Sequence, residues 1–246
     1  MKRKTLPIKV GCCGYRMKLR DYAEMFDLVE VQHTFYQPPG PVALRRWREE
    51  VPEEFEFTLK AWQLITHESR SPTYRRLRRK LSDAELAGVG SFKPTPIVLE
   101  AWNVIREAAD ILRSRSILFQ CPASFKPTEE NLENMRHFFT TIDRGELRFH
   151  WEPRGGWPAE LVRELCDDLR LTHVVDPFAV PTVTPEFVYY RLHGRTGFRY
   201  VYEDFELDEL LEMIEPDAPA YVLFNNVKMR EDGARFREVV RRGGRE

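Results

Sequence analysis

Acids, bases and imidazoles stand at or just after the ends of several short apolar segments of this chain. Glu152 and Asp176 close two of these segments, and Lys60 and His193 lie at the ends of two others. Carboxylates and imidazoles can exchange protons with a substrate, and a lysine held among other side chains supplies a fixed positive charge. Such groups suit hydrolysis or isomerisation of a phosphorylated or carboxylated substrate. The catalytic candidates are Glu152, His193, Asp176, Glu30 and Lys60.

The apolar segments are separated for the most part by stretches with helical periodicity. Strands that alternate with helices over about 250 residues predict a TIM-like (β/α)8 barrel, in which the carboxyl ends of all strands meet at one mouth. The predicted strands are residues 8–13, 29–33, 56–61, 116–120, 147–152, 172–176, 187–193 and 220–225. The predicted helices are residues 20–26, 41–51, 98–113, 129–142, 158–169, 207–214 and 232–240. The connection 177–185 is too short and proline-rich for a full helix.

Alternation along the strands indicates which side chains enter the barrel. The inward-facing residues are Glu30 and Gln32, Thr58 and Lys60, Arg148, His150 and Glu152, and Arg191 and His193. Unpaired charge in such a place costs several kcal/mol, so these groups must pair or bind something. One alternative is a self-neutralised network, for instance Glu30 with Lys60 and Glu152 with an arginine. A site is favoured, because this fold builds sites from polar groups at strand ends.

Two inward-facing cations and a glycine-containing connection favour an anionic ligand. Lys60 and Arg191 supply charge, and Gly194 follows the seventh predicted strand, near which barrels often bind phosphate through backbone N–H groups. Aromatic side chains near the mouth could stack on a base or a sugar ring. The predicted binding residues are Lys60, Gln120, Arg191, Gly194, Asn225, Asn226, Tyr15, Tyr36 and His67.

A long insertion follows the third predicted strand, where about 35 residues precede the next long helix. Within it, residues 71–81 are strongly basic and place Tyr74, Leu77 and Leu81 at helical spacing, which predicts a helix. This helix either covers the barrel rim as a solvated face or forms a lid. As a lid it would bring Arg70, Arg75 and Arg79 toward an anionic substrate such as nucleic acid.

Composition predicts one globular, cytoplasmic domain over residues 1–246. The formal charge of −1 argues against general nucleic-acid binding, and the 31% of charged residues resembles the surfaces of heat-adapted proteins. The four cysteines form no CxxC pair, so we expect reduced, buried thiols. No apolar run is long enough for a signal peptide or a membrane span. The oligomeric state is left open.

A metal requirement is not predicted, because the sequence contains no HxH or HExxH pairing. Dispersed ligands can nevertheless converge in a barrel. The residues that could then form a divalent site are His33, His67, His150, His193, Glu152 and Asp176. No other cofactor is indicated.

Six ordered motifs give the chain a recognisable resemblance. They are GCCGY at 11–15, VEVQHTFY at 29–36, LKA at 59–61 with ITH at 65–67, LFQCPASF at 118–125, YRLHG at 190–194 and FNN at 224–226. Together they resemble the YecE-like family, also called domain of unknown function 72. The long segment after Lys60, WEPR at 151–154 and VDP at 175–177 resemble its archaeal-type members, whereas His33 replaces the small polar residue usual in bacterial members. The resemblance implies a TIM-like barrel and no established reaction.

The leading hypothesis is therefore a barrel hydrolase for a phosphate-containing or other anionic substrate. Lys60 and Arg191 would hold charge, while Glu152 and His193 would exchange protons and Asp176 would orient an imidazole. One alternative is a non-catalytic module that binds a ligand or nucleic acid without turnover. Another is Schiff-base chemistry on Lys60, whose burial among charges could lower its pKa.

Overall fold

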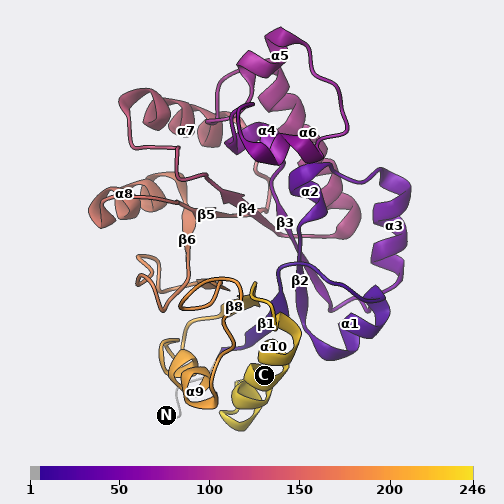
Figure 1. Cartoon of the computed structure of the whole chain (residues 1–246), viewed down its shortest axis with the longest axis vertical. Coiled ribbons are helices and arrows are strands. Elements are labelled where there is room, and N and C mark those ends of the chain that lie inside the picture. Colours follow the sequence, from indigo (N-terminus) through magenta and orange to yellow (C-terminus); the bar gives the residue numbers. More distant parts are fainter. Residues whose placement is uncertain (1–5, 246) are drawn as a thin grey trace. The chain divides into compact units, whose positions relative to one another are not determined.

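Strands β1 to β8 follow one another around a closed barrel, which confirms the predicted fold. Figure 1 labels the helices and strands along the chain. The computed structural model describes residues 6–245. Each predicted strand is present, with ends that differ by one or two residues. The strands are β1 (Ile8–Cys12), β2 (Leu28–Val31), β3 (Glu56–Lys60), β4 (Ser116–Gln120), β5 (Arg148–Glu152), β6 (Leu171–Val175), β7 (Val188–Leu192) and β8 (Ala220–Phe224).

The predicted helices outside residues 71–81 are also present, and their ends follow local chemistry. Helix α7 begins after Thr128, whose side chain accepts a hydrogen bond from the backbone N–H of Asn131, as its sequence predicts. Helix α3 ends at Glu49, before the predicted Val51, because the residue preceding Pro52 is disfavoured in a helix. The helices are α1 (Leu19–Met25), α2 (His33–Tyr36), α3 (Pro41–Glu49), α4 (Gln63–Thr66), the 3-10 helix η1 (Pro72–Arg76), α5 (Asp83–Gly88), α6 (Pro96–Leu112), α7 (Glu129–Thr141), α8 (Ala159–Leu169), α9 (Asp204–Glu212) and α10 (Met229–Arg242).

The chain divides into two compact units. Unit 1 consists of Met1–Glu30, Glu50–Glu56 and Thr172–Glu246, and unit 2 consists of Val31–Glu49 and Phe57–Leu171. In unit 1, α10 packs on β1 and β8 and against α9. In unit 2, α6 packs against α3, α4 and α5. None of the helices among residues 6–245 combines the length and the apolar character needed to cross a bilayer.

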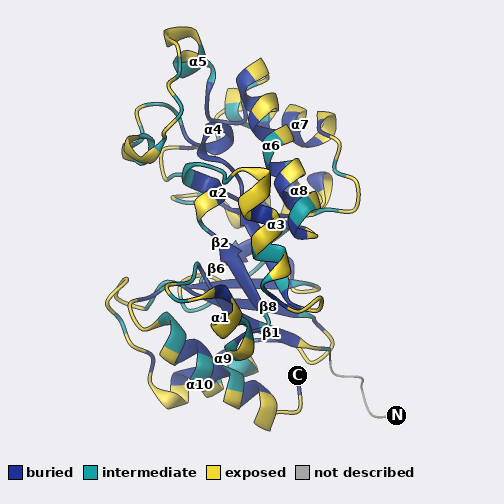
Figure 2. Ribbon diagram, turned by 90° about the vertical axis from the view of Figure 1, so that its right-hand side faces the viewer, coloured by how far each residue is buried: buried dark blue, intermediate teal, exposed yellow. Residues whose placement is uncertain are grey.

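Strand parity in unit 2 follows the prediction. Phe119 of β4 contacts Trp102 of α6 and Phe138 of α7, so its side chain belongs to the layer between strands and helices. Residues of the opposite parity therefore face the barrel interior. Cα partners between β4 and β5 include Leu118 with His150 and Gln120 with Glu152, so these four side chains share the inward face. Figure 2 shows the strands as buried and the outer faces of most helices as exposed.

Two predictions of secondary structure are wrong. Residues 71–81 do not form one helix: η1 ends at Arg76 and Leu77 has extended backbone angles. Arginines that would lie three or four positions apart in a helix repel one another, and this opposes the predicted periodicity. The predicted strand 29–33 is also too long, because β2 ends at Val31 and His33 begins α2.

Candidate functional site

A lysine and a histidine lie together at the carboxyl end of β3 in unit 2. Lys60 is buried, and its Nζ lies 4.1 Å from the centre of the Phe35 ring. Burial and then the charge of Lys60 lower the pKa of His67 to about 3. Nδ1 of His67 is 2.8 Å from Oγ1 of Thr66. His67 therefore stays neutral at physiological pH beside a fixed cation.

The insertion after β3 holds His67 in this place. The backbone N–H of His67 donates to the carbonyl of Gln63, and its own carbonyl accepts a hydrogen bond from the Tyr74 hydroxyl at 2.8 Å. Gly90 approaches the same backbone so closely that an added Cβ would lie 2.6 Å from the carbonyl oxygen of His67. Its φ of 82° also favours glycine. His67, a predicted binding residue, is thus positioned by the insertion after β3.

Gln120 and Glu152 end the neighbouring strands β4 and β5. They are Cα partners, whereas Lys60 pairs with Leu118, so Gln120 and Glu152 lie one inward-facing position nearer the carboxyl ends than Lys60. Glu152 is buried and pairs with the half-exposed Arg154 at 2.6 Å. A pair of Glu152 with an unspecified arginine is one alternative that the sequence leaves open, and the structure identifies that arginine as Arg154, which was not among the predicted site residues. Unit 2 therefore brings a buried carboxylate, an amide and two cations to its strand ends.

The basic insertion contributes further charge to unit 2. The Arg76 guanidinium lies 3.5 Å from the centre of the Tyr36 ring. Burial and then Arg76 lower the pKa of His33, whose ring is 5.7 Å from that of Trp47. Of the arginines expected to reach an anion, Arg70 pairs with Glu68 and Arg79 pairs with Glu85 and Glu100. Arg76, which the sequence did not single out, lies closer to the predicted residues.

Arg191 and Glu30 form a buried ion pair in unit 1. Nε and Nη2 of Arg191 donate to the two carboxylate oxygens of Glu30 at 3.0 and 2.8 Å, and the Tyr189 hydroxyl donates to the same carboxylate at 2.8 Å. Both charged side chains are 1% exposed or less. The predictions that Arg191 binds an anion and that Glu30 is catalytic are therefore not supported. This part of the interior is self-neutralised, with Arg191 as the partner of Glu30.

Asp176, His193 and Asn225 meet at the carboxyl ends of β6, β7 and β8 in unit 1. Oδ2 of Asp176 accepts a hydrogen bond from the backbone N–H of His193 at 2.8 Å, and Oδ1 accepts from the backbone N–H of Phe178. The imidazole Nδ1 of His193 lies 3.2 Å from Nδ2 of Asn225. Asn225 thus contacts the ring of His193 and Asp176 binds its backbone N–H, while the expectation that Asp176 orients an imidazole stays a prediction.

Hydrogen bonds within unit 1 already use the polar groups around Gly194 and Asn226. The Gly194 N–H donates to the Tyr202 hydroxyl at 2.9 Å, and Nδ2 of Asn226 donates to the Tyr200 carbonyl and the Asp232 carboxylate. The prediction that the Gly194 N–H faces a phosphate is therefore not supported. Asp232 was not predicted, because it lies far from Gly194 in the sequence, whereas Tyr202 is one of the aromatic residues expected near the mouth.

The remaining candidates have structural contacts. The ring of Tyr15 packs 6.1 Å from that of Tyr22. None of the four cysteines forms a disulfide and all are buried, as predicted, and burial raises the pKa of the Cys12 thiol to about 12. Within residues 6–245, no three His, Cys, Asp or Glu side chains are grouped so that they could hold a metal ion.

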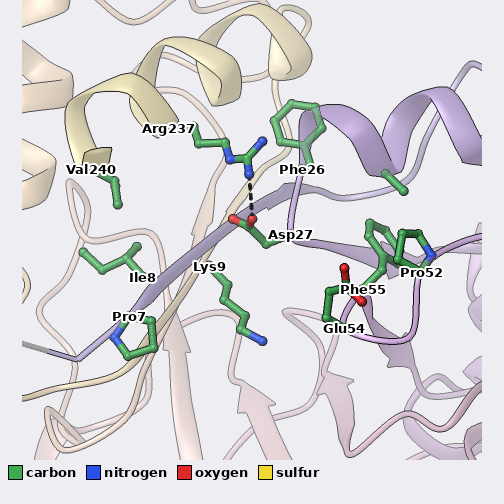
Figure 3. A pocket seen from close by; sticks show the side chains of 11 residues that line it. Pro7, Ile8, Lys9, Phe26, Asp27, Pro52, Glu54, Phe55, Arg237 and Val240 are labelled. Atoms are coloured by element: carbon green, nitrogen blue, oxygen red, sulfur yellow. Dashed lines mark hydrogen bonds and ion pairs between the residues drawn. The ribbon is translucent and has the colours of Figure 1, made fainter. Parts of the chain in front are cut away.

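A separate hollow of about 410 Å³ lies at the amino end of β1 in unit 1 (Figure 3). Its wall is largely apolar, with Ile8, Phe26 and Phe55 among its residues. Two of its charged groups, Asp27 and Arg237, pair with each other at 3.0 Å. Because the catalytic candidates lie at the carboxyl ends of the strands, this hollow is not part of the candidate site.

The family model described as protein of unknown function DUF72 matches residues 11–242. The chain belongs to this family. The resemblance drawn from the sequence motifs is thereby confirmed. No curated protein matches the chain.

Solved structures extend the comparison. A DUF72 family protein from Enterococcus faecalis is 23% identical, with a TM-score of 0.70 over 97% of this chain and 99% of that one. A DUF72 family protein from Thermotoga maritima is 20% identical, with a TM-score of 0.67 over 96% and 99%. An AP endonuclease of family 2 from Brucella melitensis is 11% identical, with a TM-score of 0.53 over 94% and 96%. At these identities the likeness establishes the fold alone.

Proposed function

We propose that this DUF72 protein is a hydrolase that binds a phosphate-containing or other anionic substrate at the carboxyl ends of β3, β4 and β5. The observation that carries the proposal is the buried Lys60 cation with the neutral His67 beside it. A desolvated cation attracts an anion more strongly than an exposed one, and a neutral imidazole can donate a hydrogen bond to it. Gln120 adds an amide donor to the same face.

Glu152 is the proposed general base. It would accept a proton from a water molecule as that water attacks phosphorus, and the bond from phosphorus to the leaving oxygen would then break. Arg154, paired with Glu152 at 2.6 Å, would keep the carboxylate in place. His193 at the end of β7 belongs to unit 1, where its Nδ1 lies 3.2 Å from Nδ2 of Asn225, and its role as a proton donor stays a separate prediction.

Phosphodiesters are the first substrate class to test, because a barrel of the same fold from Brucella melitensis is an endonuclease. The test measures release of 4-nitrophenolate from bis(4-nitrophenyl) phosphate, with and without added Mg²⁺ or Mn²⁺. We expect Glu152→Gln to lower kcat by about 100-fold or more, as loss of a general base does. Lys60→Met should raise KM by roughly tenfold or more, because a charge-assisted contact contributes about 1.5–3 kcal/mol.

Two matched variants control for charge and side-chain size. Glu133→Gln on α7 and Lys228→Met change exposed residues outside the proposed site and should leave the rate unchanged. Wild-type protein that releases no product, or Glu152→Gln with the rate of Glu133→Gln, would overturn the proposal. Binding of inorganic phosphate by wild type but not by Lys60→Met, without any turnover, would instead identify a binding module.

A further inference from the structure

The basic segment, residues 70–80, contains six cations and no acidic residue. The structure gives these cations two different environments. Arg70 pairs with Glu68 at 3.0 Å, and Arg79 is held by Glu85 at 2.8 Å and by Glu100. Contacts with carboxylates therefore already engage two of the six charges.

Exposure alternates along the second half of the basic segment. Arg76, Arg78 and Lys80 are exposed, whereas Leu77, Arg79 and Leu81 are half-buried. Arg79 and the two leucines thus fasten one side of the segment to unit 2, and the other three cations face solvent. Arg75 is also exposed. Four exposed cations, Arg75, Arg76, Arg78 and Lys80, therefore stand within six consecutive residues.

The segment is held in this conformation by specific contacts. Oε1 of Gln37 accepts hydrogen bonds from the backbone N–H groups of Arg78 and Arg79 at 3.2 and 3.3 Å. The Arg76 guanidinium lies on the Tyr36 ring, and Tyr74 binds the carbonyl of His67. The backbone that carries the exposed cations is thus held in place, and Tyr74 joins the segment to His67, which lies beside Lys60. Ordering them on a ligand costs less than ordering a flexible loop.

We propose that the basic segment binds the sugar-phosphate backbone of a single-stranded nucleic acid. This inference rests on the proposed function, because it names the polyanion whose phosphodiester would reach Lys60. The row of exposed cations suits successive phosphates. The Arg76 guanidinium covers the Tyr36 ring with one face, and because Arg76 is exposed its other face is a planar surface on which an unpaired base can stack. The side chains of an acidic peptide have no matching plane.

The test compares two triple variants that remove the same charge. Arg75→Gln with Arg78→Gln and Lys80→Gln alters the basic segment, and Lys228→Gln with Arg241→Gln and Arg242→Gln alters exposed cations of unit 1. Fluorescence anisotropy measures binding of labelled oligothymidylate and oligouridylate at increasing salt. Wild type and the unit 1 variant should bind alike. The basic-segment variant should bind at least tenfold more weakly at low salt, with a log–log salt slope reduced by about 2.

A second readout separates this inference from the proposed function. The basic-segment variant should hydrolyse bis(4-nitrophenyl) phosphate at the wild-type rate, because this small diester carries no chain to reach residues 75–80. If the wild type binds the oligonucleotide but does not hydrolyse the small diester, the proposed hydrolase function is wrong and the proposed binding surface is still supported. If both variants lose oligonucleotide binding equally, the proposal that the basic segment forms the binding surface is wrong. Equally tight binding of polyglutamate through the same residues would also overturn it, by assigning the surface to acidic proteins.

Discussion

Two buried histidines stay neutral in the folded protein. His150 of β5 has no exposed surface, and burial, followed by the charges of Arg148 and Arg144, lowers its pKa to about 3. The pKa of His67 is lowered to about 3 as well. In an unfolded chain both imidazoles titrate near pH 6.5. Between about pH 3 and pH 6.5 the unfolded state therefore binds more protons than the folded state.

This difference makes the protein sensitive to mild acid. Stability contributed by the neutral histidines is complete above pH 6.5 and is lost as the pH falls toward 3. We expect His150→Gln to remove about 1 kcal/mol of the change in unfolding free energy between about pH 7 and pH 5.5. Urea denaturation at both pH values measures it. His137→Gln, on the exposed side of α7, is the control and should keep the wild-type pH dependence.

At the level of single residues, the sequence predicts which face of a strand a side chain occupies better than it predicts which residue that side chain pairs with. Alternation correctly predicts that Glu152 and His150 share the inward face of β5. It also suggests that Arg191 enters the barrel, but not that a carboxylate 161 positions away in the sequence occupies its guanidinium. Parity depends on the backbone alone, whereas pairing depends on which strands become neighbours. Binding roles inferred from parity are therefore the least secure part of a prediction.

The connection between β7 and α9 depends on the absence of a side chain at one position. Gly194 and Gly197 both have positive φ values, 87° and 108°. A Cβ on Gly194 would lie 2.5 Å from the Gly197 carbonyl oxygen and 2.5 Å from Cβ of Tyr200, whereas a Cβ on Gly197 meets nothing within 4 Å. Both glycines therefore have backbone angles that would strain a residue with a Cβ, but they differ in the space around them.

Replacing each glycine by alanine separates strain from steric overlap. Gly197→Ala should cost about 1 kcal/mol of unfolding free energy, which is the strain of a left-handed backbone. Gly194→Ala adds a clash with backbone and should cost about 3 kcal/mol or more. Urea denaturation of both variants is the measurement. If Gly194→Ala and Gly197→Ala lose the same unfolding free energy, the loop between β7 and α9 adjusts to the added Cβ and the predicted clash at Gly194 costs nothing.

Helices and strands whose conformation depends on neighbouring residues are predicted well from the sequence. The basic segment is predicted wrongly, because its conformation depends on residues far away in the sequence. The cap at Thr128 and the apolar periodicity of α6 involve only neighbouring residues, so both are readable from the sequence. The conformation of residues 71–81 instead depends on Glu100 and Gln37, which lie outside the segment. Contacts of this kind override the helical spacing of Leu77 and Leu81.

The barrel as a whole could be predicted because its rule is simple. Parallel strands joined by helices close in sequence order, so eight correctly placed segments determine the topology. The polar pairs inside are not determined by that rule. The Glu30 and Arg191 pair occupies space that branched apolar side chains fill in many barrels. Its contribution to the stability of the molecule is therefore a separate question.

Removing one member of this pair should destabilise the protein strongly. Glu30→Gln leaves the charge of Arg191 buried without its carboxylate, and we expect a loss of about 3–5 kcal/mol in unfolding free energy. Glu30→Leu combined with Arg191→Met removes both charges and should recover most of that loss. Urea denaturation of the single and double variants measures the coupling. If the double variant is as unstable as the sum of its single substitutions, the two charges do not act as a pair.

The insertion after β3 leaves the barrel and returns to it at one place. The backbone N–H groups of Gly90 and Phe92 donate to the carbonyls of Leu64 and Ile65 at 2.8 and 2.9 Å. A loop that is sealed at its base can change length at little entropic cost, since closure entropy grows slowly with the number of residues. The sequence between these two joints can therefore vary while the barrel strands of unit 2 stay unchanged, provided that the Tyr74 contact with His67 is kept. Protein engineers could graft a different recognition surface through the same two joints.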